Sequence, residues 1–225
     1  MVRRLAESVN GCTSCRLGIA AGVAAGGRCP WVDMPRPAGA CLYVAGEPAE
    51  RVLFVKRGAV TLSRESGRGR DDEVTWAVRR SGSLLGVEAL VRDSYLDTAR
   101  AVTDVVVCVA SRADVDAWMR SREQAGRAIL ECVVLAHCAD APRRSSSEGN
   151  AEERVASWLL EQASDGSAGL PRTVVAALLG MLPETLSRAL ASLAARRLIA
   201  VSRKHVEVLD VEALEQVAAG ERPKA

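Results

Sequence analysis

The feature that most constrains the fold is a change of hydrophobic period near Asp114. Before it, from Cys41 to about Ala110, short β-type runs alternate with turn signals. After it, apolar side chains recur at steps of three, four or seven as far as about Asp140. The first pattern predicts an antiparallel sandwich or roll, and the second predicts one long helix of about 26 residues. Together they predict an α+β fold.

The two patterns define particular elements. The expected strands are 41–44, 52–55, 59–63, 74–78 and 105–109. The apolar stripe of the expected helix consists of Val115, Trp118, Ala125, Ile129, Cys132 and Ala136, with Arg122 interrupting it. A stripe so close to a heptad seam is typical of a helix that packs on a partner chain. Burial against its own domain is the alternative.

A polar, Ser-rich segment, 142–149 (PRRSSSEG), predicts a linker. Beyond it we expect helices at 151–162, 171–179 and 183–196, a tight turn at 180–182, and two strands at 199–202 and 205–209. This order predicts a winged helix-turn-helix. The expected domains are a cysteine-bearing cap (1–40), a β-roll (41–111), a dimerisation helix (112–141) and the winged helix-turn-helix (150–220).

Composition limits the function classes. The net charge is only +2, so no global field points to nucleic acid or membrane, and any such partner needs a local patch. The longest apolar run, 17–27, is too short and too rich in Gly and Ala to span a bilayer. We therefore expect a cytoplasmic protein without a membrane partner. In a reducing compartment, an odd number of cysteines, seven, favours metal binding or redox chemistry over disulfides.

Several segments resemble the CRP/FNR superfamily, and its FNR branch in particular. In the expected roll they are 46–48 (GEP), 51–58 (RVLFVKRG) and 82–86 (GSLLG); in the C-terminal domain they are 150–156 (NAEERVA) and 184–188 (ETLSR). They occur in the family's order, and the resemblance spans roughly residues 41–214. It implies a cyclic-nucleotide-binding-like β-roll, a long dimerisation helix and a winged helix-turn-helix. The implied protein is a homodimeric transcription regulator, not an enzyme, whose partners are double-stranded DNA and RNA polymerase.

The expected recognition helix carries Glu184, Ser187 and Arg188 at i, i+3 and i+4, which is one face of a helix. Arg188 can form a bidentate pair with guanine, Glu184 can accept from cytosine, and Ser187 can contact a neighbouring base. The match to the FNR pattern implies an inverted repeat of TTGAT-like half-sites. We expect phosphate contacts from Arg172, Arg203 and Lys204. A solvated Glu184–Arg188 ion pair is the alternative.

The cysteines suggest a metal centre. Cys12 and Cys15 are spaced so that two sulfurs can converge on one metal centre, and thiolates suit iron-sulfur clusters and zinc. The FNR resemblance implies that Cys12, Cys15, Cys29 and Cys108 hold a 4Fe-4S cluster that senses oxygen or nitric oxide and controls dimerisation. The thirteen-residue spacer between Cys15 and Cys29 departs from FNR, which leaves Cys41 as an alternative third ligand. Cys41 belongs to an expected strand, where a buried structural thiol is usual.

Other functions fit less well. The same thiols could bind zinc or cycle through a disulfide in an otherwise similar regulator. A metal-binding redox enzyme is a third hypothesis, but the sequence contains no Ser/His/Asp set, P-loop or Rossmann glycine pattern. The resemblance also argues against cAMP. Val87 follows Gly86, and Asp97-Thr98 stands where the nucleotide-binding branch has Arg-Ser, so a carboxylate would face the phosphate.

Overall fold

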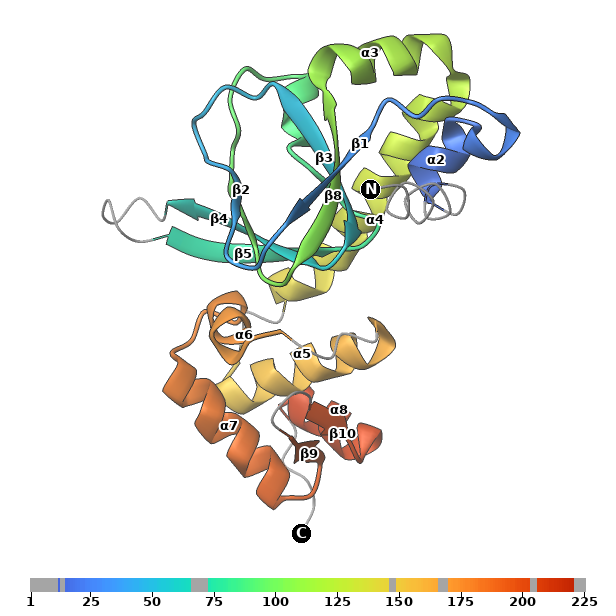
Figure 1. Ribbon diagram of the computed structural model, residues 1–225. Helices are drawn as coiled ribbons and strands as arrows, with labels where there is room; N and C mark the ends of the chain where they lie inside the picture. The colour runs from blue at the N-terminus through green and yellow to red at the C-terminus, as the bar shows by residue number, and fades with distance from the viewer. Residues whose placement is uncertain are drawn as a thin grey trace. The chain divides into compact units, whose positions relative to one another are not determined.

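The computed structural model of the chain describes residues 12, 15–65, 73–145, 149–165, 170–202 and 206–220. Contacts divide the chain into two compact units, Met1–Cys138 and Ala139–Ala225 (Figure 1). Each unit has its own hydrophobic core. The predicted α+β class is confirmed, because a β-roll is followed by helices and a C-terminal helix-turn-helix.

Two four-stranded antiparallel sheets form the roll in the N-terminal unit. Their strand orders are β1-β8-β3-β6 and β2-β7-β4-β5. The strands are β1 (Val32–Arg36), β2 (Cys41–Tyr43), β3 (Arg51–Arg57), β4 (Ala59–Glu65), β5 (Glu73–Arg80), β6 (Leu84–Leu85), β7 (Thr98–Ala101) and β8 (Val105–Ser111). Buried side chains of both sheets, such as Val55, Leu85 and Ala99, belong to a single core.

All five expected strands are present, whereas β1, β6 and β7 were not expected. Strand β1 corrects the predicted cap: residues 32–36 fall within 1–40 but pair along their whole length with β8. Most of their side chains are exposed and Pro35 interrupts them, so alternation does not reveal the strand. The described part of the cap is therefore a short helix α2 (Arg16–Ala20), a 3-10 turn η1 (Val23–Ala25) and their connections.

The expected single helix is two helices, α3 (Arg112–Ser121) and α4 (Glu123–Ser145). Arg122 separates them with extended backbone angles, φ −141° and ψ 117°. Its side chain reaches the cap, where a Cβ at Gly22 would lie 3.1 Å from an Arg122 guanidinium nitrogen. The residue that interrupts the apolar stripe in the sequence is thus also the residue at which the helix breaks.

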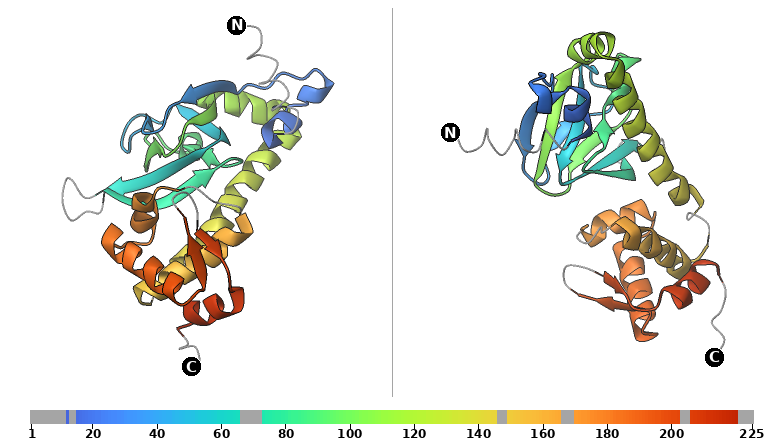
Figure 2. Two further views of the ribbon diagram at one scale, coloured as in Figure 1. Left: turned by 60° about the horizontal axis from the view of Figure 1, so that its bottom comes forward. Right: turned by 90° about the vertical axis from the view of Figure 1, so that its right-hand side faces the viewer.

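The prediction that the apolar stripe faces a partner chain is also wrong. Val115, Trp118, Ala125, Ile129 and Cys132 are all buried in the core of their own unit. A different set of α4 side chains is exposed. Leu130, Val133 and Val134 are 61%, 37% and 47% exposed and lie at i, i+3 and i+4, on a face turned away from the buried one. Figure 2 shows α4 running along the side of the strands. We call these three residues the exposed α4 face.

The C-terminal unit consists of α5 (Ala151–Asp165), α6 (Arg172–Leu178), α7 (Pro183–Ala195), the antiparallel pair β9 (Ile199–Val201) and β10 (Val206–Val208), and α8 (Val211–Ala218). The expected elements are confirmed, and α8 is additional. At the start of α5, the Asn150 Oδ1 accepts from the Glu152 and Glu153 amides, and the Glu153 carboxylate accepts from the Asn150 amide. This reciprocal capping box stabilises the helix end.

Within the described residues no single helix is long and apolar enough to cross a membrane. Only α6 and α7 taken together reach that length, and they are bent by 98° at their junction. Their large apolar side chains, including Leu186 and Leu193, fill the core of the C-terminal unit.

A substitution at Gly58, between β3 and β4, measures how closely the backbone of the roll is packed at this turn. Its φ is +92°, and a Cβ there would lie 2.6 Å from the Asp104 carbonyl oxygen. We expect Gly58→Ala to lower the free energy of unfolding by more than the roughly 1–3 kcal/mol of left-handed backbone strain alone. Gly39→Ala is the control, because Gly39 has φ +82° but no atom within 4 Å of such a Cβ. Urea unfolding curves that show equal losses for both variants would contradict the expectation.

Candidate functional site

The four predicted ligand cysteines come from the cap and the roll. Cys12 and Cys15 precede α2, Cys29 precedes β1, and Cys108 lies buried in β8. Cys15 caps α2, and its Sγ accepts a hydrogen bond from the Gly18 amide at 3.1 Å. A Cβ at Gly18 would lie 1.8 Å from the Cys12 carbonyl oxygen, so only glycine lets α2 approach Cys12 this closely.

The thiols of these cysteines influence one another electrostatically. Burial raises the pKa of the Cys29 thiol, and Cys15, Cys12 and Asp33 raise it further, whereas a hydrogen bond from the Trp31 backbone lowers it. Burial likewise raises the pKa of Cys108, as do a hydrogen bond to Asp33 and the neighbouring Cys12, while Lys56 lowers it. Cys12 and Asp33 contribute to the pKa shifts of both Cys29 and Cys108, so these cap and β8 thiols share an electrostatic environment.

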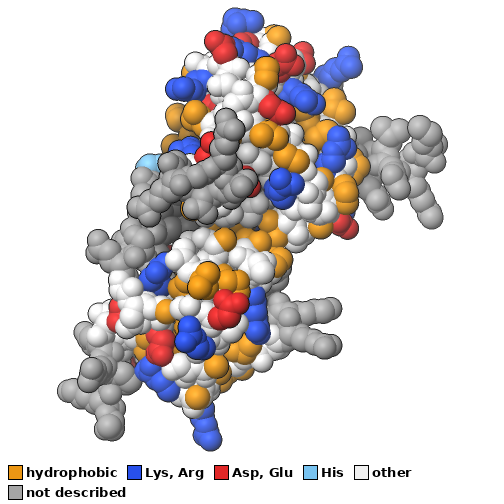
Figure 3. Space-filling view, turned by 90° about the vertical axis from the view of Figure 1, so that its left-hand side faces the viewer, with side chains coloured by type: hydrophobic (Ala, Val, Ile, Leu, Met, Phe, Trp, Pro, Cys, Tyr) orange, Lys and Arg blue, Asp and Glu red, His pale blue; other side chains and the backbone are white. Residues whose placement is uncertain are grey.

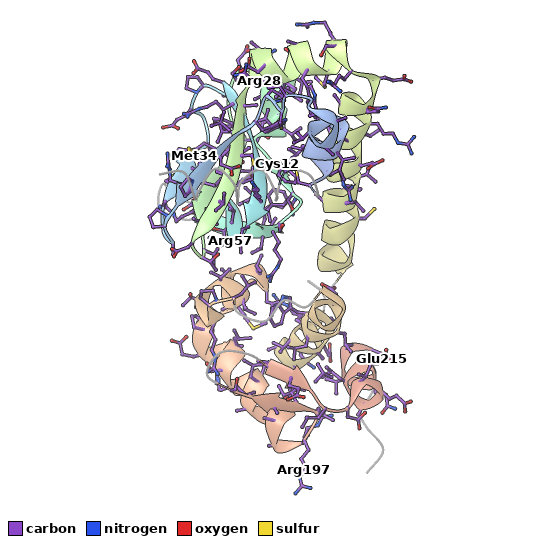
Figure 4. The ribbon with its side chains drawn as sticks, turned by 45° about the vertical axis from the view of Figure 1, so that its right-hand side comes forward. Cys12, Arg28, Met34, Arg57, Arg197 and Glu215 are labelled. Atoms are coloured by element: carbon purple, nitrogen blue, oxygen red, sulfur yellow. The ribbon has the colours of Figure 1, made fainter. Side chains whose placement is uncertain are left out.

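Two charged residues that the sequence analysis missed lie among these thiols. Lys56 Nζ is 2.9 Å from Asp33 Oδ2 and also donates to Cys12 Sγ at 3.7 Å. Cys108 Sγ donates to Asp33 Oδ1 at 3.0 Å. The available signal for Asp33 was an acidic residue between two apolar ones, just after Cys29. Figure 4 labels Cys12 beside the strands of the roll.

The predicted ligands are four thiols, a donor type that suits both iron-sulfur clusters and zinc. In the part of the chain that is described, no three Cys, His, Asp or Glu side chains lie close enough to hold a single metal ion. A tetrahedral zinc site requires four donors within about 2.3 Å of one point.

The remaining cysteines differ from one another. Cys41 is exposed, contrary to the burial expected in a strand, and its Sγ donates to the Tyr43 carbonyl oxygen at 3.4 Å. Cys132 is buried in the core of its own unit, and Cys138 is exposed. Burial raises the pKa of Cys132, while Arg16 lowers it and Glu131 and Cys15 raise it. Cys132 thus lies where the cap meets α4.

The cap packs directly on the long helices. Leu17, Ala20 and Ala21 are buried in the same core as the inner face of α4. Trp31 meets Trp118 of α3 edge to face, with ring centroids 6.3 Å apart. An ion pair of 3.5 Å joins Arg16 to Glu131. The segment between the predicted ligands Cys15 and Cys29 is therefore supported by α4.

The position expected to exclude a cyclic nucleotide is occupied by protein contacts. Asp97 is buried, pairs with Arg64 and accepts a hydrogen bond from Trp76 Nε1 at 2.8 Å. The Asp97 hydrogen bond raises the pKa of Arg64, against a lowering by burial. Tyr43 and Tyr95 stack on each other with centroids 4.1 Å apart. The buried carboxylate already has cationic and donor partners within the chain.

The second candidate site is the helix-turn-helix. Helices α6 and α7 cross at a bend of 98° around Gly180, within the range of such motifs. Glu184, Ser187 and Arg188 are exposed at the start of α7, while Leu186 between them is buried and fixes the helix on the core. In the described structure neither Glu184 nor Arg188 takes part in an ion pair, so the solvated-pair alternative is not observed.

The expected phosphate contacts are only partly described. Arg172 is exposed at the first residue of α6, whereas Arg203 and Lys204 lie outside the described residues. Arg196 pairs with Glu152 of α5 at 3.2 Å, and Arg197 points away from the unit (Figure 4). On the face shown in Figure 3, basic and acidic side chains are interspersed, in keeping with the small net charge.

Comparisons with known families match both units. Residues 35–122 match the cyclic nucleotide-binding domain, and residues 153–217 match the Crp-like helix-turn-helix domain. A cyclic-nucleotide-binding roll followed by this helix-turn-helix is the architecture of one class of bacterial regulators. The chain contains both domains in this order, which is the domain architecture of the CRP/FNR family.

Individual relatives are more distant. The chain is 43% identical over 56 residues to a global nitrogen regulator of Synechocystis; that segment is 25% of this chain and 24% of the relative. Among solved structures it is similar to FixK2 from Bradyrhizobium japonicum (23% identity, TM-score 0.72, 87% and 99% of the two chains covered). It is also similar to a CRP-family regulator from Thermus thermophilus (23% identity, TM-score 0.70, 85% and 100% covered). At these identities the structures support the fold alone.

Proposed function

We propose that the protein is a dimeric, DNA-binding transcription regulator whose cysteine site controls its dimerisation. The observation that carries the DNA-binding part is the start of α7. There Glu184, Ser187 and Arg188 are exposed on one helix face, unpaired with each other, on a helix-turn-helix with a β-hairpin after it. A recognition helix presents such N-terminal side chains to base edges in the major groove. A TTGAT-like half-site, read twice by a dimer, is the proposed target.

Arg188 tests base recognition. We expect Arg188→Ala to weaken binding to an inverted TTGAT-like repeat by about 1–3 kcal/mol and to relax discrimination at the guanine. Arg188→Lys keeps the charge but not the planar fork, so it should lose most of the same discrimination. The measurement is fluorescence anisotropy on the matched repeat and on scrambled DNA. Equal weakening on both DNAs would mean that Arg188 only contacts phosphate.

The exposed α4 face supports the dimer. An apolar stripe of Leu130, Val133 and Val134 on a surface helix is costly to leave in water, and a second copy can cover it with the identical stripe. The buried face of the same helix is occupied by its own unit. We infer that the two copies meet through this face rather than through the stripe expected from the sequence.

Two glutamate substitutions separate this face from the rest of α4. Leu130→Glu should raise the dimer dissociation constant about tenfold or more, because a charge would be buried at the interface. Leu135→Glu is the control: Leu135 is 55% exposed but lies on another side of the helix. Sedimentation equilibrium of the full chain, purified without oxygen, distinguishes them. Equal effects of the two substitutions would refute the assignment of the face.

We propose that Cys12, Cys15, Cys29 and Cys108 hold a 4Fe-4S cluster. A bound cluster would supply a redox-sensitive tie between the four thiolates. The contribution of the protein is to place the four ligands on two different parts of the N-terminal unit. Cys12, Cys15 and Cys29 belong to the cap that packs on α4, and Cys108 belongs to β8, which leads into α3. A cluster bound to all four cysteines would hold the cap against one side of α4, and the exposed α4 face lies on the opposite side of that helix. Loss of the cluster on exposure to oxygen or nitric oxide would weaken the packing of the cap on α4.

The visible spectrum tests the cluster. Protein purified without oxygen should show a broad band at about 400 nm that fades in air, with about four irons per chain. Cys29→Ser and Cys108→Ser should lose the band, whereas Cys41→Ser should keep it. Loss of the band in Cys41→Ser but not in Cys29→Ser would make Cys41 the third ligand. A colourless wild-type protein that contains zinc or no metal would favour the zinc or thiol-switch alternatives.

A further inference from the structure

A partly buried ion pair stands among the predicted ligands. The Lys56 and Asp33 side chains are only 15% and 26% exposed, and Nζ lies 2.9 Å from Oδ2 and 3.3 Å from Oδ1. Each partner also touches one of the cysteines: Lys56 donates to Cys12, and Asp33 accepts from Cys108. Removing two charges from water costs free energy that can exceed their mutual attraction. The presence of this ion pair is therefore weak evidence that it stabilises the fold.

The strand register places Lys56 at the cysteines. Asp33 and Cys108 are directly opposite each other in the β1–β8 ladder, and Cys108 is opposite Phe54 in the β8–β3 ladder. The β3–β8 register then shifts between Val55 and Arg57, so the regular alternation of the ladder is broken at Lys56. Such a β-bulge re-aims a side chain, and bulges are frequent beside functional sites. Here the bulge brings the ammonium group to Asp33 and Cys12.

The positive charge of Lys56 can offset the negative charge of bound thiolates. Four thiolates around a cluster concentrate negative charge in a partly buried region, where electrostatic interactions are strong. A hydrogen-bonding cation next to a ligand sulfur stabilises that charge and disfavours removal of an electron, because hydrogen bonds and charges around the ligands set the reduction potential. The carboxylate of Asp33 repels the thiolates, but it also fixes the position of the Lys56 ammonium group by accepting two hydrogen bonds from it.

We propose that Lys56 is a positioning residue of the cysteine site: its ammonium group, held by Asp33, stabilises the thiolate of Cys12 and slows oxidative loss of the group bound there. This inference rests on the proposed cluster. It adds a residue from the roll, in β3, to a site whose predicted ligands come from the cap and β8.

The test uses the full chain reconstituted with iron and sulfide without oxygen. Lys56→Met keeps most of the side-chain length and removes the charge. We expect it to lower the midpoint potential of the cluster and to shorten the half-life of the visible band in air by roughly threefold or more. Arg57→Gln is the matched control, since it removes one positive charge from the exposed neighbouring residue. Lys56→Arg should recover most of the wild-type values.

The outcomes separate the inference from the proposed function. A wild-type protein that assembles no cluster overturns both. A wild-type cluster whose potential and lifetime are the same in Lys56→Met overturns the role of Lys56 alone, as does an equal change in Arg57→Gln. Circular dichroism monitors folding of each variant. If Lys56→Arg behaves like Lys56→Met, the requirement is for the shape of lysine rather than its charge, and the inference is overturned.

Discussion

Strand β8 holds the N-terminal unit together because it is hydrogen-bonded on both sides and leads directly into the helices. On one side it pairs with β1, the strand that follows the cap, and on the other with β3. Ser111, its last residue, caps α3 by accepting from the Asp114 amide. Any change at Cys108, in the middle of this strand, is therefore close to the cap, the roll and the start of the helical segment.

The regular parts of the fold could be predicted from the sequence because they follow simple periods. Strands β3, β4, β5 and β8 have apolar runs between turns, and the helix-turn-helix has its proline, glycine and capping asparagine where these residues are favoured. Strand β1 could not be found in this way, since its side chains are mostly exposed and its position depends on pairing with β8. Tertiary pairing, not local preference, forms that strand.

The candidate sites were predictable to different degrees. Exposure of Glu184, Ser187 and Arg188 follows from helical spacing alone. The partner-facing side of the long helix does not, because periodicity identifies an apolar stripe without saying what covers it. Ile129 and Cys132 are buried within their own unit, while Leu130 and Val133 are left to solvent. Lys56 and Asp33 were missed for a related reason: a register shift in β3, invisible in the sequence, brings them together.

The extended conformation of Arg122 has a consequence for how α4 is set. A continuous helix transmits any rotation along its length, but the hydrogen-bond ladder between α3 and α4 is interrupted at this residue. The direction in which Leu130 and Val133 point around the helix axis is therefore set by their spacing from Glu123, the first residue of α4, and not by their spacing from the start of α3. One residue inserted between Glu123 and Leu130 would turn the rest of α4 by about 100° and carry its apolar side out of alignment. An insertion within α3 would not change the helical spacing of residues within α4, because the two helices are separated by the extended residue Arg122.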